Sequence, residues 1–127
     1  MRWSVWLVLA FCTLLPFSPA LAMEQAVIVH FQYGSTDLTR LYDLEDEIEA
    51  AIKSSDAGEY DGHEIAIDAS AGTLFMYGLS ADRLLDVVMP LLRNADFMEG
   101  AQVVRRYGPA DSGAREVSTR VESGPHP

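Results

Sequence analysis

Residues 60–78 read YDGHEIAIDASAGTLFMYG, and their pattern decides the fold. Residues 60–68 and 73–78 each predict a strand, with Ile65 and Ile67 on one face of the first and Leu74 and Met76 on one face of the second. The small residues at positions 69–72 predict a turn between them. We therefore predict an antiparallel hairpin.

The apolar residues of this hairpin predict its register. Placing Ile67 opposite Leu74 brings Ile65 opposite Met76, so that all four share one face. The same register pairs His63 with Gly78 and Glu64 with Tyr77.

The flanking segments complete a two-layer pattern. Residues 25–33 alternate like a strand, and residues 101–107 predict another. Apolar residues spaced three and four apart predict an amphipathic helix of about 17 residues between the first strand and the hairpin. The same spacing predicts a second helix between the hairpin and the last strand. The apolar positions are Leu38, Leu41, Leu44, Ile48 and Ile52 in the first, and Leu84, Leu85, Val88, Leu91 and Leu92 in the second. Ser80 is a good N-cap for the second helix, and Pro90 predicts a kink or an early end there.

The resulting order is β-α-β-β-α-β. Two right-handed β-α-β units with this order give an α+β, ferredoxin-like sandwich. We expect a four-stranded antiparallel sheet in the order 4-1-3-2, with both helices on one face. Fold alone assigns no function.

The two ends of the chain predict export and a loose tail. Met1-Arg2 precedes a mostly apolar run, and Ala20-Leu21-Ala22 follows it as a cleavage site. We expect residues 1–22 to be a signal peptide cleaved after Ala22, which predicts a periplasmic or secreted protein, and the alternative is a retained membrane anchor. Residues 23–108 would then form the domain. Residues 109–127, rich in Gly, Ser, Pro and charge, are expected to be a flexible tail.

Composition excludes several classes of function. Residues 1–22 contain Arg2 and no acid, so cleavage changes the formal charge from −10 to −11. Binders of nucleic acid and of anionic lipid need basic surface, so neither partner is expected, and after cleavage no stable membrane association is expected either. Acidity favours solubility and a basic protein partner. Cys12, the only cysteine, leaves with the signal, which excludes disulfides and thiolate chemistry in the mature chain.

The most polar cluster is Asp61, His63 and Glu64. Carboxylates beside a histidine can bind a metal or a small ligand, or act as an acid–base pair. The structural interpretation, which we prefer, has Asp61 capping the second helix and His63 packed against Gly78. The three histidines are scattered, so we predict no metal site, no cofactor and no catalytic residues.

Other charged residues have structural interpretations. The acids of the first helix form a solvated face, and the alternative of loose calcium binding is disfavoured because calcium sites need a wrapping loop. They are Asp43, Glu45, Asp46, Glu47 and Glu49. Arg105 and Arg106 are expected to protect the edge of the sheet or to make rim contacts.

The sheet face away from the helices is the remaining candidate site. It is expected to carry Ala26, Ile28, Phe75, Tyr77 and Val104. Such a face suits a protein partner or a second copy of the chain, and the alternative is an ordinary half-exposed sheet.

Three segments resemble those of a group of small bacterial ferredoxin-like domains. They are residues 58–64 (GEYDGHE), Tyr77-Gly78 followed by Ala81-Asp82, and Arg106-Tyr107-Gly108. The resemblance covers about residues 25–108. It implies the same fold and a bacterial, hence periplasmic, protein, and it brings no catalytic residues.

These observations favour an exported, non-catalytic binding protein. Its most specific form is an acidic inhibitor or immunity-type protein that covers a basic partner. One alternative is a small-ligand or metal-binding domain, with or without minor enzymatic activity, centred on Asp61, His63 and Glu64. Another is a structural homodimer formed through the open sheet face.

Overall fold

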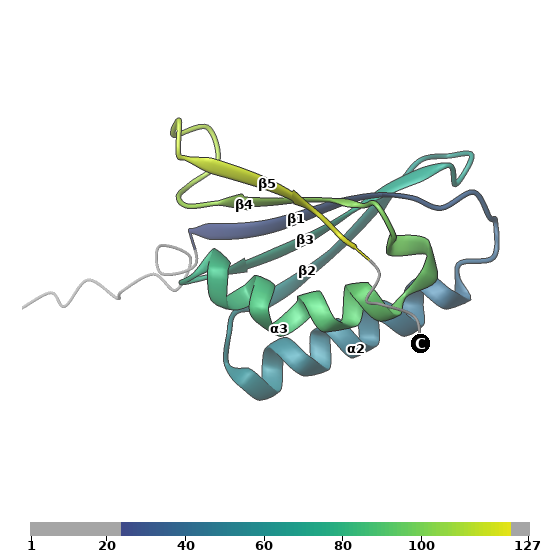
Figure 1. The fold of residues 1–127 in the computed structure, drawn as a ribbon, viewed down its shortest axis with the longest axis horizontal. Coiled ribbons are helices and arrows are strands. Elements are labelled where there is room, and N and C mark those ends of the chain that lie inside the picture. Colours follow the sequence, from purple (N-terminus) through teal and green to yellow (C-terminus); the bar gives the residue numbers. More distant parts are fainter. Residues whose placement is uncertain (1–23, 123–127) are drawn as a thin grey trace, which may run out of the picture.

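The computed structural model describes residues 24–122, so the predicted signal, residues 1–22, lies outside the described range. In chain order the elements are β1 (Gln25–Gln32), α2 (Thr39–Ser55), β2 (Glu59–Ile65), β3 (Ala71–Gly78), α3 (Ala81–Asn94), the 3₁₀ turn η1 (Asp96–Met98), β4 (Gln102–Arg106) and β5 (Glu116–Arg120). The strands form one antiparallel sheet in the order β2-β3-β1-β4-β5. Both helices cover one face of this sheet, and the other face carries no helix (Figure 1).

The core lies between the sheet and the two helices. Val27, Val29 and Phe31 of β1 are buried there, as are Leu74 and Met76 of β3. Alternation in the strands and three–four spacing in the helices supply this apolar layer, which confirms the predicted α+β class. None of the helices within residues 24–122 is both long and apolar enough to cross a membrane.

Side chains next to the helix ends determine where the helices begin and end. The Asp37 carboxylate accepts a hydrogen bond of 3.0 Å from the Thr39 amide at the start of α2, and Lys53 lies in its last turn. Ser80 caps α3 as expected, with its Oγ accepting from the Arg83 amide at 3.2 Å. Free N–H groups at a helix start need such acceptors, so the predicted Ser80 cap sets where α3 begins.

Pro90 does not end α3, which continues to Asn94. Proline lacks the N–H that would bond to the carbonyl of Asp86 four residues earlier. Pro90 and Asp86 are both exposed, so the missing bond lies on the solvent side of α3. The predicted early end is therefore wrong.

The β2–β3 hairpin forms in a different register from the predicted one. Ile65 lies opposite Gly72 and His63 opposite Leu74, so the pairings of Ile67 with Leu74 and of His63 with Gly78 are wrong. A tight turn at its tip explains the shift. The Asp68 carboxylate accepts from the amide and hydroxyl of Ser70, and Ile67 is left fully exposed.

A β-bulge interrupts β2 between Tyr60 and Gly62. An extra residue on one strand changes which side chains face the core, so Tyr60 and His63 both point toward the helices. Asp61 is exposed at the bulge. The prediction that Asp61 caps the second helix is wrong, because the side chains of Ser80 and Gln25 bind the first amides of α3.

The region predicted to be a flexible tail contains a fifth strand. β5 pairs with β4 along its whole length, from Gln102 opposite Arg120 to Arg106 opposite Glu116. The sheet therefore has five strands instead of four, and β4 is an interior strand. Arg105 and Arg106 cannot protect an edge there, so the edge-protection half of that expectation is wrong.

Candidate functional site

The sheet surface without helices, called the open face below, is organised in rows that run across the strands. The central row places Phe75 of β3, Ile28 of β1 and Val104 of β4 side by side. All three side chains are half-buried, with no helix above them. The open face thus has an apolar centre.

A second row lies beside the first. Tyr77 of β3, Ala26 of β1 and Arg106 of β4 are neighbours, with Glu59 and Glu116 at the two ends. Ala26 is fully buried between its larger neighbours, and Arg106 Nε donates to the Gly108 carbonyl at 2.8 Å. This row therefore contains an aromatic side chain and a hydrogen-bonded guanidinium, with Ala26 between them.

A third row, on the other side of the apolar centre, is polar. Its members, in order across the sheet, are Glu64, Thr73, His30, Gln102 and Arg120. His30 Nδ1 lies 3.1 Å from Thr73 Oγ1, and Arg120 donates to the Gly100 carbonyl at 2.9 Å. Together with Gln32, these side chains line a hollow of about 710 Å³.

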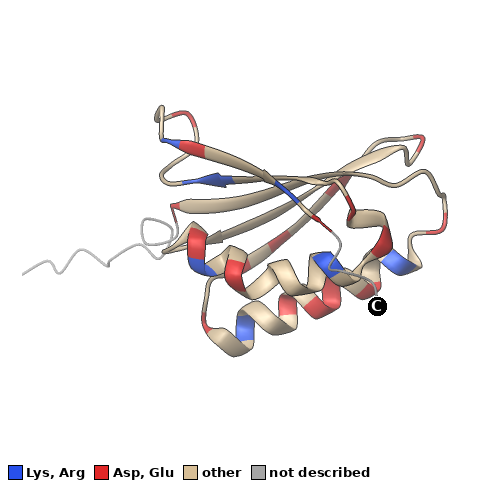
Figure 2. Ribbon diagram, viewed as in Figure 1, with Lys and Arg blue, Asp and Glu red and all other residues tan. Residues whose placement is uncertain are grey.

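Charge is unevenly distributed over the molecule. Figure 2 shows acidic residues along α2 and arginines in β4 and near β5. On the open face, Glu59 and Glu64 lie on the β2 side, whereas Arg106 and Arg120 lie on the β4 and β5 side. The open face therefore runs from an acidic edge to a more basic one.

On the helix side of the sheet, Glu45 joins two residues of β2. Glu45 is 9% exposed and is the one buried charged residue within residues 24–122. Its Oε1 accepts from the Tyr60 hydroxyl and lies 2.6 Å from His63 Nδ1. Because a carboxylate only accepts, Nδ1 must carry the proton. The Tyr42 ring lies beside the imidazole at 6.0 Å between centroids.

This cluster connects the outer strand of the sheet to α2. A carboxylate that orients an imidazole also occurs in general-base catalysis, where the second ring nitrogen faces a substrate. Here the partners of Glu45 are a tyrosine and a histidine on the same strand, three positions apart. Burial, followed by the hydrogen bond with Glu45, raises the pKa of Tyr60 far above its ordinary value. The cluster links β2 to α2 through two hydrogen-bond contacts of one carboxylate.

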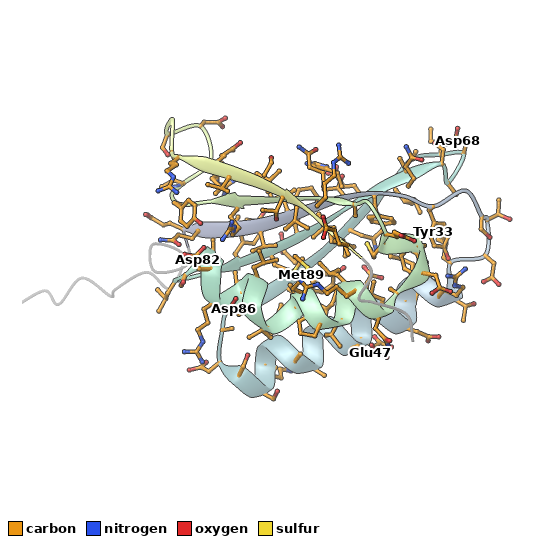
Figure 3. All side chains as sticks on the ribbon, in the orientation of Figure 1. Tyr33, Glu47, Asp68, Asp82, Asp86 and Met89 are labelled. Atoms are coloured by element: carbon orange, nitrogen blue, oxygen red, sulfur yellow. The ribbon has the colours of Figure 1, made fainter. Side chains whose placement is uncertain are left out.

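A second cluster fixes the start of α3 against β4. Asp82, labelled in Figure 3, lies in the first turn of α3. Its Oδ1 accepts from Tyr107 Oη at 2.6 Å and from Arg105 Nη1 at 2.8 Å. The Tyr107 hydrogen bond, with that from Arg105, lowers the pKa of Asp82, and the same bond raises the pKa of Tyr107. Exposed ion pairs of this kind contribute little stability.

The structure separates the six residues predicted as a site. Ile28, Phe75 and Tyr77 lie on the open face as expected, and Ile28 is directly opposite Phe75. Glu64 lines the hollow on that face. His63 faces α2 on the other side of the sheet, and Asp61 lies at the bulge. Asp61, His63 and Glu64 therefore do not converge on one point.

The sequence patterns did not identify two residues of these groups, Glu45 and Arg120. Glu45 was expected on the solvated face of α2, yet it occupies the inner position between Leu44 and Ile48 in the three–four pattern. That position in the helical pattern was the signal that Glu45 faces the core. Arg120 was missed because a short strand, Glu116 to Arg120, was hidden in a polar segment. In this segment Glu116, Ser118 and Arg120 alternate with the β-branched residues Val117 and Thr119, and that alternation was the available signal of a strand.

Within residues 24–122, no three histidine, cysteine, aspartate or glutamate side chains are grouped so that they could hold a metal ion. Protein-family models, curated proteins and solved structures give no significant match to this chain. The resemblance of three segments to small bacterial ferredoxin-like domains therefore stays a prediction from the sequence.

The raised pKa of Tyr60 predicts a loss of stability at alkaline pH. Below its ordinary pKa of 10.0, the phenol is neutral in both the folded and the unfolded chain. Above that pH the unfolded chain loses the proton while folded Tyr60 keeps it, so stability falls as pH rises. Urea unfolding below and above pH 10 should show a steeper loss for the wild type than for Tyr60→Phe. Equal losses would contradict the placement of Tyr60.

Proposed function

We propose that this chain is an exported, non-catalytic binding protein that docks a basic protein partner on its open face. The observation that carries the proposal is the central row of Phe75, Ile28 and Val104, which no helix covers. Protein interfaces combine an apolar centre with a polar rim, and aromatic side chains are common anchors in them. The rows that contain Tyr77 and His30 supply such a rim on both sides.

Charge supports a basic partner. Glu59 and Glu64 border the open face on the β2 side, and α2, which packs beside β2, carries further exposed acids. These exposed acids are Asp43, Asp46, Glu47 and Glu49. A partner that sits on the apolar row with its cations over β2 would meet complementary charge, which speeds association and makes binding sensitive to salt.

The positions of the two described histidines support a non-catalytic role. His63 is held by Glu45 inside the helix-side cluster, and His30 lies against Thr73 in the polar row. A ligand or metal site centred on Asp61, His63 and Glu64 would need these side chains to meet, and they lie at different places on the sheet. Docking at the open face is therefore favoured over that alternative.

We also propose that β1 to β4 and the two helices form a ferredoxin-like sandwich, with β5 added beside β4. The neighbour order β2-β3-β1-β4 within the sheet supports this assignment. The apolar run and small-residue cleavage site in residues 1–22 support export into the periplasm or beyond.

The test uses a matched pair of tyrosines on opposite sides of the molecule. Tyr77 lies on the open face, whereas Tyr42 is 49% exposed on α2. Immobilised wild type, Tyr77→Ser and Tyr42→Ser would each be exposed to periplasmic extract at low and high salt. Any captured protein would be purified and its affinity for the three forms measured by calorimetry.

We expect a basic protein that binds the wild type and Tyr42→Ser at low salt. Its affinity for Tyr77→Ser should be about 30-fold weaker, as for an aromatic anchor worth about 2 kcal/mol. Equal affinity for all three forms would contradict docking at the open face. Failure to capture any protein at either salt concentration would contradict the proposed partner. Loss of self-association in Tyr77→Ser alone would favour a face-to-face homodimer instead.

A further inference from the structure

β5 forms one edge of the sheet, and its outward backbone groups have no strand partner within residues 24–122. Two backbone bonds flank its pairing with β4: Tyr107 N to Arg115 O at 3.0 Å and Val121 N to Ala101 O at 2.9 Å. In an antiparallel pair such bonds fall on alternate residues. The odd-numbered residues of β5 therefore bond to β4, and the N–H and C=O groups of residues 116, 118 and 120 point outward.

The sequence of β5 is complementary to itself. It reads Glu116-Val117-Ser118-Thr119-Arg120, with opposite charges at equal distances from Ser118. If two copies pair antiparallel about Ser118, Glu116 of each copy lies opposite Arg120 of the other. Ser118 and these two residues are the ones with outward backbone groups, so charge pairing and backbone pairing occur in the same register.

The side chains between them also suit this pairing. Val117 and Thr119 are half-buried on the helix side of the sheet. Pairing about Ser118 places Val117 of one copy opposite Thr119 of the other, a β-branched pair of the kind that stabilises adjacent strands.

The other edge of the sheet is unsuited to pairing. β2 contains the bulge at Asp61, and its charged residues Glu59, Asp61 and Glu64 are all acidic. Bulges and charges of one sign are common protections of sheet edges. β5 has no bulge, and its two charges are of opposite sign, which makes it the edge that can accept another strand.

Net charge does not oppose the contact. The acids of β2 lie four strand spacings from β5, which is about 19 Å. The screening length at physiological salt is about 8 Å, so their repulsion is weak at this edge. From residue 115 to residue 122 the edge carries two arginines and two glutamates, so its own formal charge is zero.

We propose that β5 pairs antiparallel with β5 of a second copy about Ser118, which makes one continuous sheet across the two copies. The two-fold axis would be perpendicular to the sheet, so the open faces of both copies lie on the same side. This inference is independent of the proposed function. If both hold, a partner meets a double docking surface with an apolar row from each copy.

Sedimentation velocity of the purified chain across a wide range of concentration tests the pairing. The wild type is expected to form dimers. Glu116→Arg places like charges opposite each other at both ends, and its dimer should be at least about tenfold weaker. The double variant Glu116→Arg, Arg120→Glu restores opposite charges and should recover dimerisation.

A second pair of variants tests the backbone contact. Ser118→Pro removes an outward N–H that the single copy does not use, and dimerisation should be lost, whereas Ser118→Ala should retain it. Circular dichroism melts would show whether each variant is folded. A wild type that stays monomeric would overturn the proposal, as would a dimer that is unaffected by Glu116→Arg. A dimer lost only in Tyr77→Ser would place the contact on the open face instead.

Discussion

Gly58→Ala should lower the free energy of unfolding by about 3 kcal/mol or more. Gly58 connects α2 to β2 with φ at +152°, a conformation that side chains rarely adopt. A Cβ there would lie 2.0 Å from the Tyr77 carbonyl oxygen and 2.9 Å from the Gly78 Cα. Both contacts are backbone atoms of β3, which cannot move without disturbing the sheet. Backbone strain and overpacking each cost about 1–3 kcal/mol.

Gly113→Ala is the matched control. Gly113 also has positive φ, at +71°, but a Cβ there would meet nothing within 4 Å. Only the strain of the backbone remains, and the expected loss is about 1 kcal/mol. Urea unfolding of both variants separates the cost of backbone strain from the cost of the close contacts with β3. Similar losses for Gly58→Ala and Gly113→Ala would show that the close approach of residue 58 to β3 is wrong.

Glu45→Ala is expected to cost about 2–3 kcal/mol. The substitution leaves the Tyr60 hydroxyl and His63 Nδ1 without their shared acceptor in a half-buried layer between α2 and β2. Hydrogen bonds to charged groups contribute about 1.5–3 kcal/mol, and removal of one partner leaves the others unpaired. The loss should appear as a lower urea midpoint.

Glu47 provides the control on the same helix. It is exposed, and Glu47→Ala should change stability by no more than about 0.5 kcal/mol. A double-mutant cycle of Glu45→Ala with Tyr60→Phe would then measure the coupling between the two side chains. If Glu45→Ala is as mild as Glu47→Ala, or the cycle shows no coupling, the tie between α2 and β2 does not exist.

Helical periodicity predicted α2 and α3 well because each helix buries one continuous apolar stripe. The Ser80 cap was also predictable, since it depends on one side chain and the amides next to it. Strand alternation placed Ile28, Phe75 and Tyr77 on the correct face for the same local reason. These features require only nearby residues, so the sequence contains enough information to find them.

The hairpin register and β5 depend on tertiary contacts that local patterns do not contain. The bulge at Asp61 changes the facing of β2 midway, so alternation alone cannot place both Tyr60 and His63 on the helix side. The Asp68 turn then fixed a register in which Ile67 is outside the sheet. β5 has few apolar residues, and its pairing with β4 is what stabilises it. Glu45 was misplaced because its charge was given more weight than its position in the helix.

The open face, and not the acidic outer face of α2, is the proposed docking surface. Backbone-amide NMR of the labelled chain, titrated with a captured basic protein, tests it most directly. Docking on the open face predicts the largest shifts at Ile28, Phe75 and Val104, with smaller shifts along the β2 edge. Shifts concentrated on the outer side of α2, at Asp46 and Glu49, with none in the central row would contradict the account.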